Sequence, residues 1–181
     1  MHGIDASEAL VARLRAKPGG EAIPVTIGDF ADVGVEGRYP LVYLVFNTLF
    51  GLQSQDDQVR CFENVAPHLT DGGVFVIDAF VPDLAKYHDG RVSVLKIELD
   101  TVVLDVALMD KNAQLNDSQH IVVRPDGVRF VPVRLRWAYP PELDLMARIA
   151  GLRLRDRWSS WRKDPFTKSS GQHVSVYERP A

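Results

Sequence analysis

Two aspartates that follow short apolar runs are the first residues whose type and position suit chemistry. Asp5 comes after "HGI" and Asp29 after "VTIG". Ligands of open α/β sheets bind beyond the carboxyl ends of the strands, so acids at those ends are candidates for ligand contact. One carboxylate can accept hydrogen bonds from both hydroxyls of a ribose, and a second can accept one from an exocyclic amine. The pair suits a nucleoside, although each acid alone is more often a helix cap or a turn residue.

The composition is that of one ordinary globular domain spanning residues 1–181. Hydrophobic residues make up 46% of the chain, charged residues 25%, and the formal net charge is −3, which gives no electrostatic case for nucleic acid. The single cysteine, Cys61, rules out an internal disulfide framework. No stretch is apolar and long enough to span a bilayer or to act as a signal peptide. We therefore expect a cytoplasmic protein with neither nucleic acid nor a membrane as partner.

The segments around the two aspartates predict the parallel core of an α/β protein. Ser7 can cap a helix that stops at "KPGG". The almost unbroken apolar stretch "YPLVYLVFNTLF" is typical of a strand covered on both faces, so we expect it to be central in its sheet. "SQDDQVRCFENVAPHL" then predicts an amphipathic helix and "VFVIDAF" a buried strand. This order is the βαβ pattern of a doubly wound fold.

The second half of the chain predicts antiparallel strands followed by a last helix. Apolar and polar residues alternate over residues 91–137, with turn chemistry at "RPDG", which predicts an antiparallel β insertion in hairpin order. "YPPELDLMARIAGLRL" predicts a helix that turns Leu143, Met146 and Ile149 inward and ends at Gly151. "LRLRDRW" and "HVSVYERP" are expected as closing strands, antiparallel to each other.

The order of these pieces resembles the class I S-adenosylmethionine-dependent methyltransferases. The resemblance rests on "GIDAS", "GDF", "FNTL" and "HLTDGGVFVIDAF", together with the closing "YPPELDLMARIAGLRLRDRW" and "VSVYER", and it covers the chain from Gly3 to Arg179. It implies a Rossmann-like fold with a mostly parallel sheet, S-adenosylmethionine as the cofactor and a small-molecule methyl acceptor. Small-molecule members of the family are similar in placing antiparallel strands before the last helix.

The resemblance also implies roles for individual residues. Asp5 and the adjacent Ala6 match the position that holds the cofactor ribose, and Asp29 and Phe30 match the position at the adenine. The residues after "YPLVYLV" match a segment that lines the cofactor and faces the acceptor, which assigns Phe46 and Asn47 to the cofactor and Thr48 to the acceptor. Where the insertion returns to the core, Arg136, Trp137 and Tyr139 are further candidates for acceptor contact, although packing is the favoured role of the two aromatic residues.

No catalytic residue and no metal site are assigned. Methyl transfer to an amine demands little beyond proximity, desolvation and a route for the proton. His68 sits where a cation would complement the end of a helix. His88, His120 and His173 are scattered without the spacing of metal ligands. The aromatic and basic segment "RWSSWRKDPF" is best interpreted as a solvated loop with aromatic anchors.

The beginning of the chain raises a further expectation. The resemblance implies a first strand and a glycine-rich turn before Gly3, and the sequence as given has neither. We expect either a start placed too late within a longer natural chain, with impaired cofactor binding, or a degenerate relative. Loss of a central strand would leave unpaired sheet edges, which predicts a homo-oligomer. The alternatives to an active enzyme are a non-catalytic dimerising or regulatory module and, with a poorer match to "GDF", an NAD-binding oxidoreductase.

Overall fold

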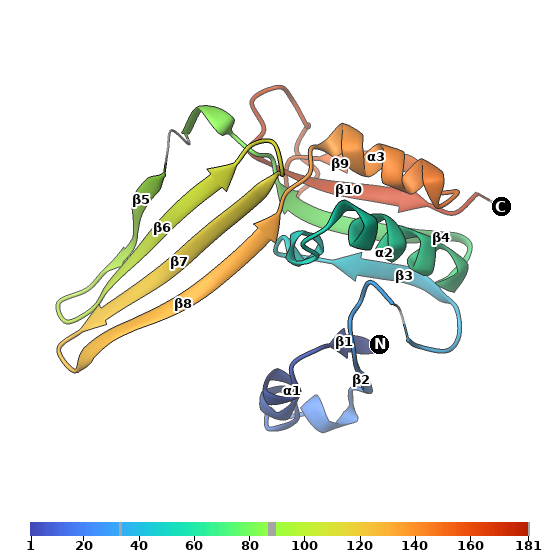
Figure 1. Ribbon diagram of the computed structural model, residues 1–181. Coiled ribbons are helices and arrows are strands. Elements are labelled where there is room, and N and C mark those ends of the chain that lie inside the picture. The colour runs from blue at the N-terminus through green and yellow to red at the C-terminus, as the bar shows by residue number, and fades with distance from the viewer. Residues whose placement is uncertain (33, 87–89, 181) are drawn as a thin grey trace.

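The computed structural model describes residues 1–32, 34–86 and 90–180 and shows an α/β fold (Figure 1). In these residues the strands form three sheets. The central sheet, which with its helices we call the body, has the strand order β3 (Tyr39–Leu44), β4 (Leu69–Phe80), β10 (Gln172–Glu178) and β9 (Arg153–Trp158). The second sheet, which we call the arm, consists of β5 (Arg91–Ile97), β6 (Val102–Asp110), β7 (Leu115–Arg124) and β8 (Gly127–Arg136). The third is a pair, β1 (Gly3–Asp5) and β2 (Val25–Ile27).

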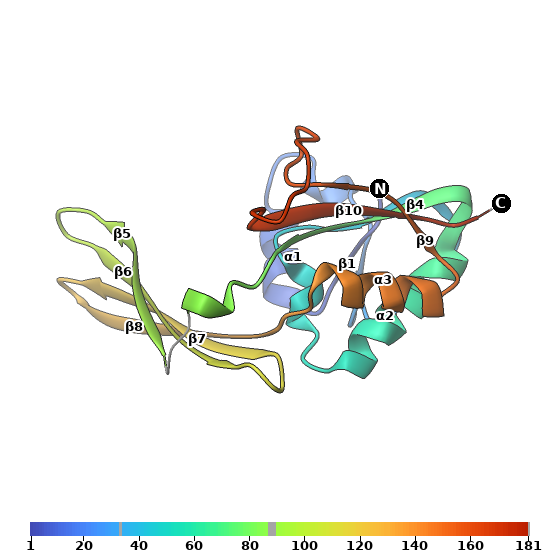
Figure 2. The same cartoon turned by 90° about the horizontal axis from the view of Figure 1, so that it is seen from above.

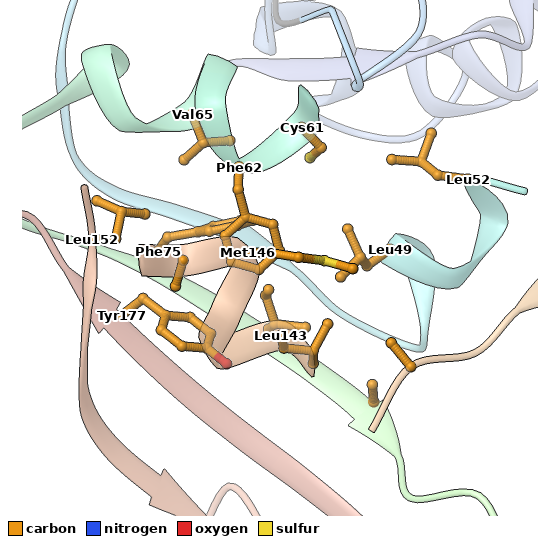
Figure 3. Close-up of a cluster of buried hydrophobic side chains, with 14 of the residues drawn as sticks. Leu49, Leu52, Cys61, Phe62, Val65, Phe75, Leu143, Met146, Leu152 and Tyr177 are labelled. Carbon is orange, nitrogen blue, oxygen red and sulfur yellow. The ribbon is translucent and has the colours of Figure 1, made fainter. Parts of the chain in front are cut away.

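The body is held together by one hydrophobic core. Strand β3 runs parallel to β4, and β10 runs antiparallel to both β4 and β9. The helices α2 (Gln55–His68) and α3 (Pro140–Ile149) lie over one face of this sheet (Figure 1). Figure 3 shows the side chains between them, where the ring of Phe62 meets Phe75 and Tyr177 edge to face, with centroids 5.2 and 5.6 Å away. The expected antiparallel closing pair is confirmed as β9 and β10.

The expectation that "YPLVYLVFNTLF" forms a central strand is wrong for the described chain. Strand β3 is at the edge of its sheet and pairs only with β4 among the described strands. Leu41 is 49% exposed and Tyr43 is 46% exposed. Apolar residues on both faces indicate that a strand can be buried. A central position also requires a neighbouring strand on each edge and packed helices or strands over each face.

The helix ends follow the capping residues in the sequence. The Ser7 hydroxyl accepts a hydrogen bond from the backbone of Leu10 at the start of α1 (Glu8–Arg15), and Ser54 caps α2 in the same way. Gly151 follows α3 with a φ of +74°, which favours glycine after a helix. Ile149, predicted to face inward, is 61% exposed because it lies on the last turn of α3, beyond the edge of the core.

The β1–β2 pair is attached to the body by side chains of α2. No strand pairing joins it to the central sheet in the described part of the chain. Arg60 forms an ion pair with Asp32 at 2.8 Å, and Asn64 donates to the carbonyl oxygen of Ala31. The ring of His68 lies between two carbonyl oxygens, with Nδ1 2.6 Å from that of Asn64 and Nε2 2.9 Å from that of Val35. His68 therefore connects the pair to α2 besides ending that helix.

The arm projects from the body as an open four-stranded sheet (Figures 1 and 2). All its strand pairs are antiparallel, and the "RPDG" segment forms the predicted turn between β7 and β8. Its strands span the range 91–136, close to the predicted insertion at 91–137. Within the described residues, no helix has both the length and the hydropathy that crossing a membrane requires.

Candidate functional site

Asp5 and Asp29 both cap local turns. Asp5 ends β1, and its Oδ1 accepts a hydrogen bond from the backbone of Ser7 at 2.8 Å. Asp29 follows β2, and its Oδ1 accepts one from the backbone of Ala31 at 2.9 Å. These bonds are the turn and cap contacts that such acids commonly make. Each bond uses one carboxylate oxygen, so Oδ2 of either acid is left out of these turns.

A cavity of about 410 Å³ lies between β1 and β3. Three of the residues predicted for cofactor or acceptor contact, Asp5, Phe30 and Thr48, line it together. The wall facing them comes from β3 and α2, including Leu41, Tyr43, Cys61, Val65 and His68. A mostly apolar hollow with a few polar groups at strand ends is the usual form of a small-molecule site. Ala6, Asp29, Phe46 and Asn47, and also Arg136, Trp137 and Tyr139, are outside its lining.

Phe46 and Asn47 form a strained turn at the carboxyl end of β3. Their φ angles are +55° and +61°, in the left-handed region that side chains rarely adopt. The turn is fixed to the end of β4 because Asn47 donates its backbone N–H to the carbonyl of Asp78 at 3.1 Å and accepts from the backbone of Phe80 at 2.8 Å through its Oδ1. The Phe46 ring is left 85% exposed. Strain of this kind, fixed by its surroundings, is concentrated at ligand sites.

Asp78 is a residue at this edge that sequence reasoning missed. It lies near the carboxyl end of β4, half-buried, and its Oδ2 accepts a hydrogen bond from the indole Nε1 of Trp161 at 3.0 Å. Trp161 belongs to the loop 159–171 between β9 and β10, which places this loop at the same edge as the Phe46–Asn47 turn. The signal was present in "VFVIDAF", since the rule that selected Asp5 applies equally to an acid ending this strand.

Arg136 sits in a buried network where the arm joins the body. It is 5% exposed, and its guanidinium donates to Gln58 at 2.6 Å, to Gln114 at 2.9 Å and to Glu142 at 2.7 Å. Burial acts to raise the pKa of Glu142, but hydrogen bonds from Gln114, Arg136 and Gln55 outweigh it and lower that pKa below its usual value. These protein partners support a structural role for Arg136.

The two aromatic residues after Arg136 are also engaged by the protein. Trp137 is 2% exposed and meets the ring of Tyr139 edge to face at 5.3 Å. The hydroxyl of Tyr139 donates to the carbonyl of Pro82 at 3.2 Å. These contacts support the packing role that the sequence favoured for both.

The ionisable groups near the cavity indicate no nucleophile and no metal centre. Burial raises the pKa of Cys61 to about 12, with a smaller contribution from the Asp29 charge, so its thiol is neutral at physiological pH. In residues 1–32, 34–86 and 90–180, no three His, Cys, Asp or Glu side chains gather in a way that could hold a metal ion. His88 lies outside the described residues.

Comparison with known proteins identifies the family. The structure of the CcbJ methyltransferase from Streptomyces caelestis superposes with a TM-score of 0.93, at 37% identity over 99% of this chain and 74% of that one. The chain belongs to the S-adenosylmethionine-dependent methyltransferases. The resemblance predicted from the sequence is therefore confirmed, and so are the Rossmann-like fold and S-adenosylmethionine as the cofactor.

Two further comparisons agree with this membership, and no protein-family profile matches the sequence. A cypemycin N-terminal methyltransferase from a Streptomyces species is 27% identical over 180 residues, which are 97% of this chain and 73% of that protein. The S-adenosylmethionine-bound structure of CalS10, an amino pentose methyltransferase from Micromonospora echinaspora, shares the fold, with a TM-score of 0.73 and 20% identity over 98% of this chain and 73% of that one. This methyltransferase chain thus spans about three quarters of each of these relatives.

Proposed function

We propose that this chain transfers a methyl group from S-adenosylmethionine to a small-molecule acceptor. The observation that carries the proposal is the cavity in which Asp5, Phe30 and Thr48 meet beside the strained Phe46–Asn47 turn, in a chain of a methyltransferase family. The acceptor class is supported by two proteins of the same fold, since CalS10 is an amino pentose methyltransferase and KedS8 is a sugar N-methyltransferase.

The donor set fits the nucleoside half of the cofactor. Oδ1 of Asp5 is used by its own turn, and Oδ2 can accept hydrogen bonds from ribose hydroxyls. Phe30 lines the cavity and offers an aromatic surface for an adenine ring. Asp29, the preceding residue, has Oδ2 for the exocyclic amine, while its Oδ1 fixes the turn that presents Phe30. In this proposal each acid uses Oδ1 for a hydrogen bond within its own turn and Oδ2 for a hydrogen bond to the cofactor.

The chain contributes positioning and desolvation to the reaction. When bound, S-adenosylmethionine supplies the methyl group on a sulfonium. Thr48 and the Phe46–Asn47 turn lie at the end of β3, where they can orient the acceptor, and the wall from β3 and α2 offers apolar surface against which a bound ligand would lose water. The neutral Cys61 thiol takes no part as a nucleophile. Direct transfer requires no covalent enzyme intermediate.

Calorimetric titration with S-adenosylhomocysteine tests this assignment. We expect binding to the wild-type chain, and binding about 10–100-fold weaker to Asp5→Ala because the ribose loses a charged carboxylate that accepts its hydrogen bonds. Asp5→Asn keeps an oxygen for the Ser7 turn and separates loss of charge from loss of the turn. Asp71→Ala is the control, since Asp71 is exposed at the opposite end of β4.

The other outcomes each decide between functions. A folded chain that binds no S-adenosylhomocysteine would support the non-catalytic dimerising or regulatory module. Binding of NAD in its place would point to an oxidoreductase. Equal affinities of the Asp5→Ala and Asp71→Ala variants would mean that the cofactor binds elsewhere.

A further inference from the structure

Asp78 differs from most of the partly buried acids because no cation pairs with it. Within the described residues, the acids that are at least partly buried and form an ion pair with an arginine are Asp57, Asp105, Glu142, Asp144, Asp156 and Glu178. The exceptions in the same part of the chain are Asp5 and Asp78. Taking a carboxylate out of water costs free energy unless a cation or hydrogen bonds compensate it, so an unpaired one is a candidate for ligand contact. The cofactor ribose is the proposed partner of Asp5, which leaves Asp78 to be explained.

The Asp78 side chain leaves the body sheet on the face opposite α2 and α3. Its neighbours in β4, Ile77 and Ala79, point into the core beneath those helices, so the alternation along the strand turns Asp78 the other way. On that face, Asp78 and Trp158 of β9 lie opposite the same residue of β10. Figure 2 shows the loop between β9 and β10 on this side of the sheet. The carboxylate therefore faces the same side as the aromatic residues of β9 and of this loop.

One oxygen of Asp78 is held in place and the other is available. Oδ2 accepts the hydrogen bond from the indole Nε1 of Trp161 at 3.0 Å, whereas Oδ1 accepts none from the described residues. Lys163, in the same loop, is turned to the ring of Trp158, with its Nζ 5.0 Å from the ring centroid. The indole is a neutral donor, so it fixes the orientation of the carboxylate without compensating its charge.

Asp78 lies next to the turn that is proposed to orient the acceptor. Its carbonyl oxygen accepts the backbone hydrogen bond of Asn47 at 3.1 Å, so the Phe46–Asn47 turn is attached directly to it. Val45, the residue before this turn, lines the cavity of about 410 Å³. The rings of Phe46 and Trp161 are 85% and 57% exposed, and the faces of aromatic rings attract cations. A carboxylate and two exposed rings at one edge of the sheet suit a ligand that carries a positive charge.

We propose that Oδ1 of Asp78 binds the amine nitrogen of the methyl acceptor. The proposal rests on the methyl transfer proposed above and defines the acceptor as a primary or secondary amine that binds in its protonated form. The N–H groups of the ammonium donate to Oδ1, and its charge compensates that of the carboxylate. A neutral ether of the same shape offers neither a donor nor a charge, so Asp78 selects the amine over it.

Chemical-shift titration of the full chain tests the proposal, with the indole N–H signal of Trp161 as the reporter. This signal is assigned by its loss in Trp161→Phe. The probe is piperidine, a secondary amine that is protonated at neutral pH, and its control is tetrahydropyran, a neutral ring of the same size. We expect saturable shifts with piperidine and much smaller ones with tetrahydropyran, because only the ammonium can pair with Asp78.

Two variants separate the charge of Asp78 from its structural contact. Asp78→Asn keeps an oxygen for the indole N–H, so the Trp161 signal should stay in its hydrogen-bonded position, while the affinity for piperidine falls at least about 10-fold. The matched control is Asp71→Asn, the same change of charge at the opposite end of β4, where the side chain is 73% exposed. This control should bind piperidine as the wild type does.

The remaining outcomes overturn the proposal. Equal shifts with piperidine and tetrahydropyran would mean that this edge binds the ring and not the charge. A wild-type affinity in Asp78→Asn, or an equal loss in Asp71→Asn, would remove Asp78 from the site. Calorimetry with S-adenosylhomocysteine is a separate measurement on the same chain. Piperidine binding through Asp78 without S-adenosylhomocysteine binding would keep the amine site and refute the methyl transfer, so the two failures are distinguishable.

Discussion

The body and the arm are both four-stranded sheets, yet they are stabilised in different ways. In β10 of the body, five consecutive residues from His173 to Tyr177 are buried, so both faces of the strand are covered. In β8 of the arm, Arg136 is the one residue that the chain buries, and it lies at the body end. The same backbone ladder thus occurs with and without a core. Hydrogen-bond pattern alone says nothing about where the stability of a sheet resides.

The largest expected contrast between the two sheets comes from removing one ring in each. Phe62→Ala empties a site of 0% exposure in the body and should lower the free energy of unfolding by about 3–5 kcal/mol. Phe130→Ala removes an exposed ring from the arm and should cost under about 1 kcal/mol in dilute, monomeric protein. Urea denaturation measures both. Equal losses would show that the arm contributes to the stability of the monomer as the body does.

The free energy of unfolding should depend on Arg136, at the junction between the body and the arm, far more than on Arg134 of the same strand. Arg136→Met leaves the partly buried Glu142 without its cation and should cost roughly 3 kcal/mol. Arg134→Met, two residues earlier, removes an ion pair whose side chains are 53% and 48% exposed, and little change is expected. Urea denaturation at low protein concentration measures the free energy of unfolding of both variants. A large loss in Arg134→Met would contradict the prediction.

The smallest expected effect is a pH dependence of the free energy of unfolding that arises from a histidine in the body. Burial, helped by the Arg157 charge and opposed by Asp144, lowers the pKa of His173 from its ordinary 6.5 to about 4. The folded state holds His173 neutral, so its contribution is fully present above pH 6.5 and is lost as the pH falls to about 4. The loss is at most about 3 kcal/mol.

Unfolding free energies measured across this pH window check the assignment. In His173→Asn the loss should shrink, because the side chain that takes up the proton on unfolding is gone, while an amide can keep the contact with the Ser175 hydroxyl. A variant with the wild-type pH profile would assign the titration to another group.

The parts of the fold that local chemistry decides could be predicted from the sequence. Ser7 and Ser54 mark the starts of their helices, and "RPDG" marks the hairpin turn, because a cap or a turn involves only neighbouring residues. The edge position of β3 could not be predicted, since the apolar pattern of a strand says nothing about how many partners it has.

Part of the candidate site could also be predicted from the sequence. Asp5, Phe30 and Thr48, to which the family resemblance assigned cofactor or acceptor contact, line one cavity, and their contact with a ligand stays a prediction. The contact between Asp78 and Trp161 joins residues 83 positions apart in the chain, and no local pattern links them. Two of the three partners of Arg136, Gln58 and Gln114, are also distant in sequence, which is why a cation at the end of a strand was a candidate for acceptor contact.

The attachment of the β1–β2 pair has a mechanical consequence. Asp5 is carried by this pair, whereas Thr48 is carried by the body, and the two are connected through side chains of α2 such as Arg60 and His68 rather than through a common ladder. The two walls of the cavity are therefore joined by side-chain contacts and by Ala31 and Phe30, which pack into the core of the body, and not by a shared strand ladder. A nucleoside that bound both walls would add a further link between the pair and the body, so ligand binding should stabilise this attachment.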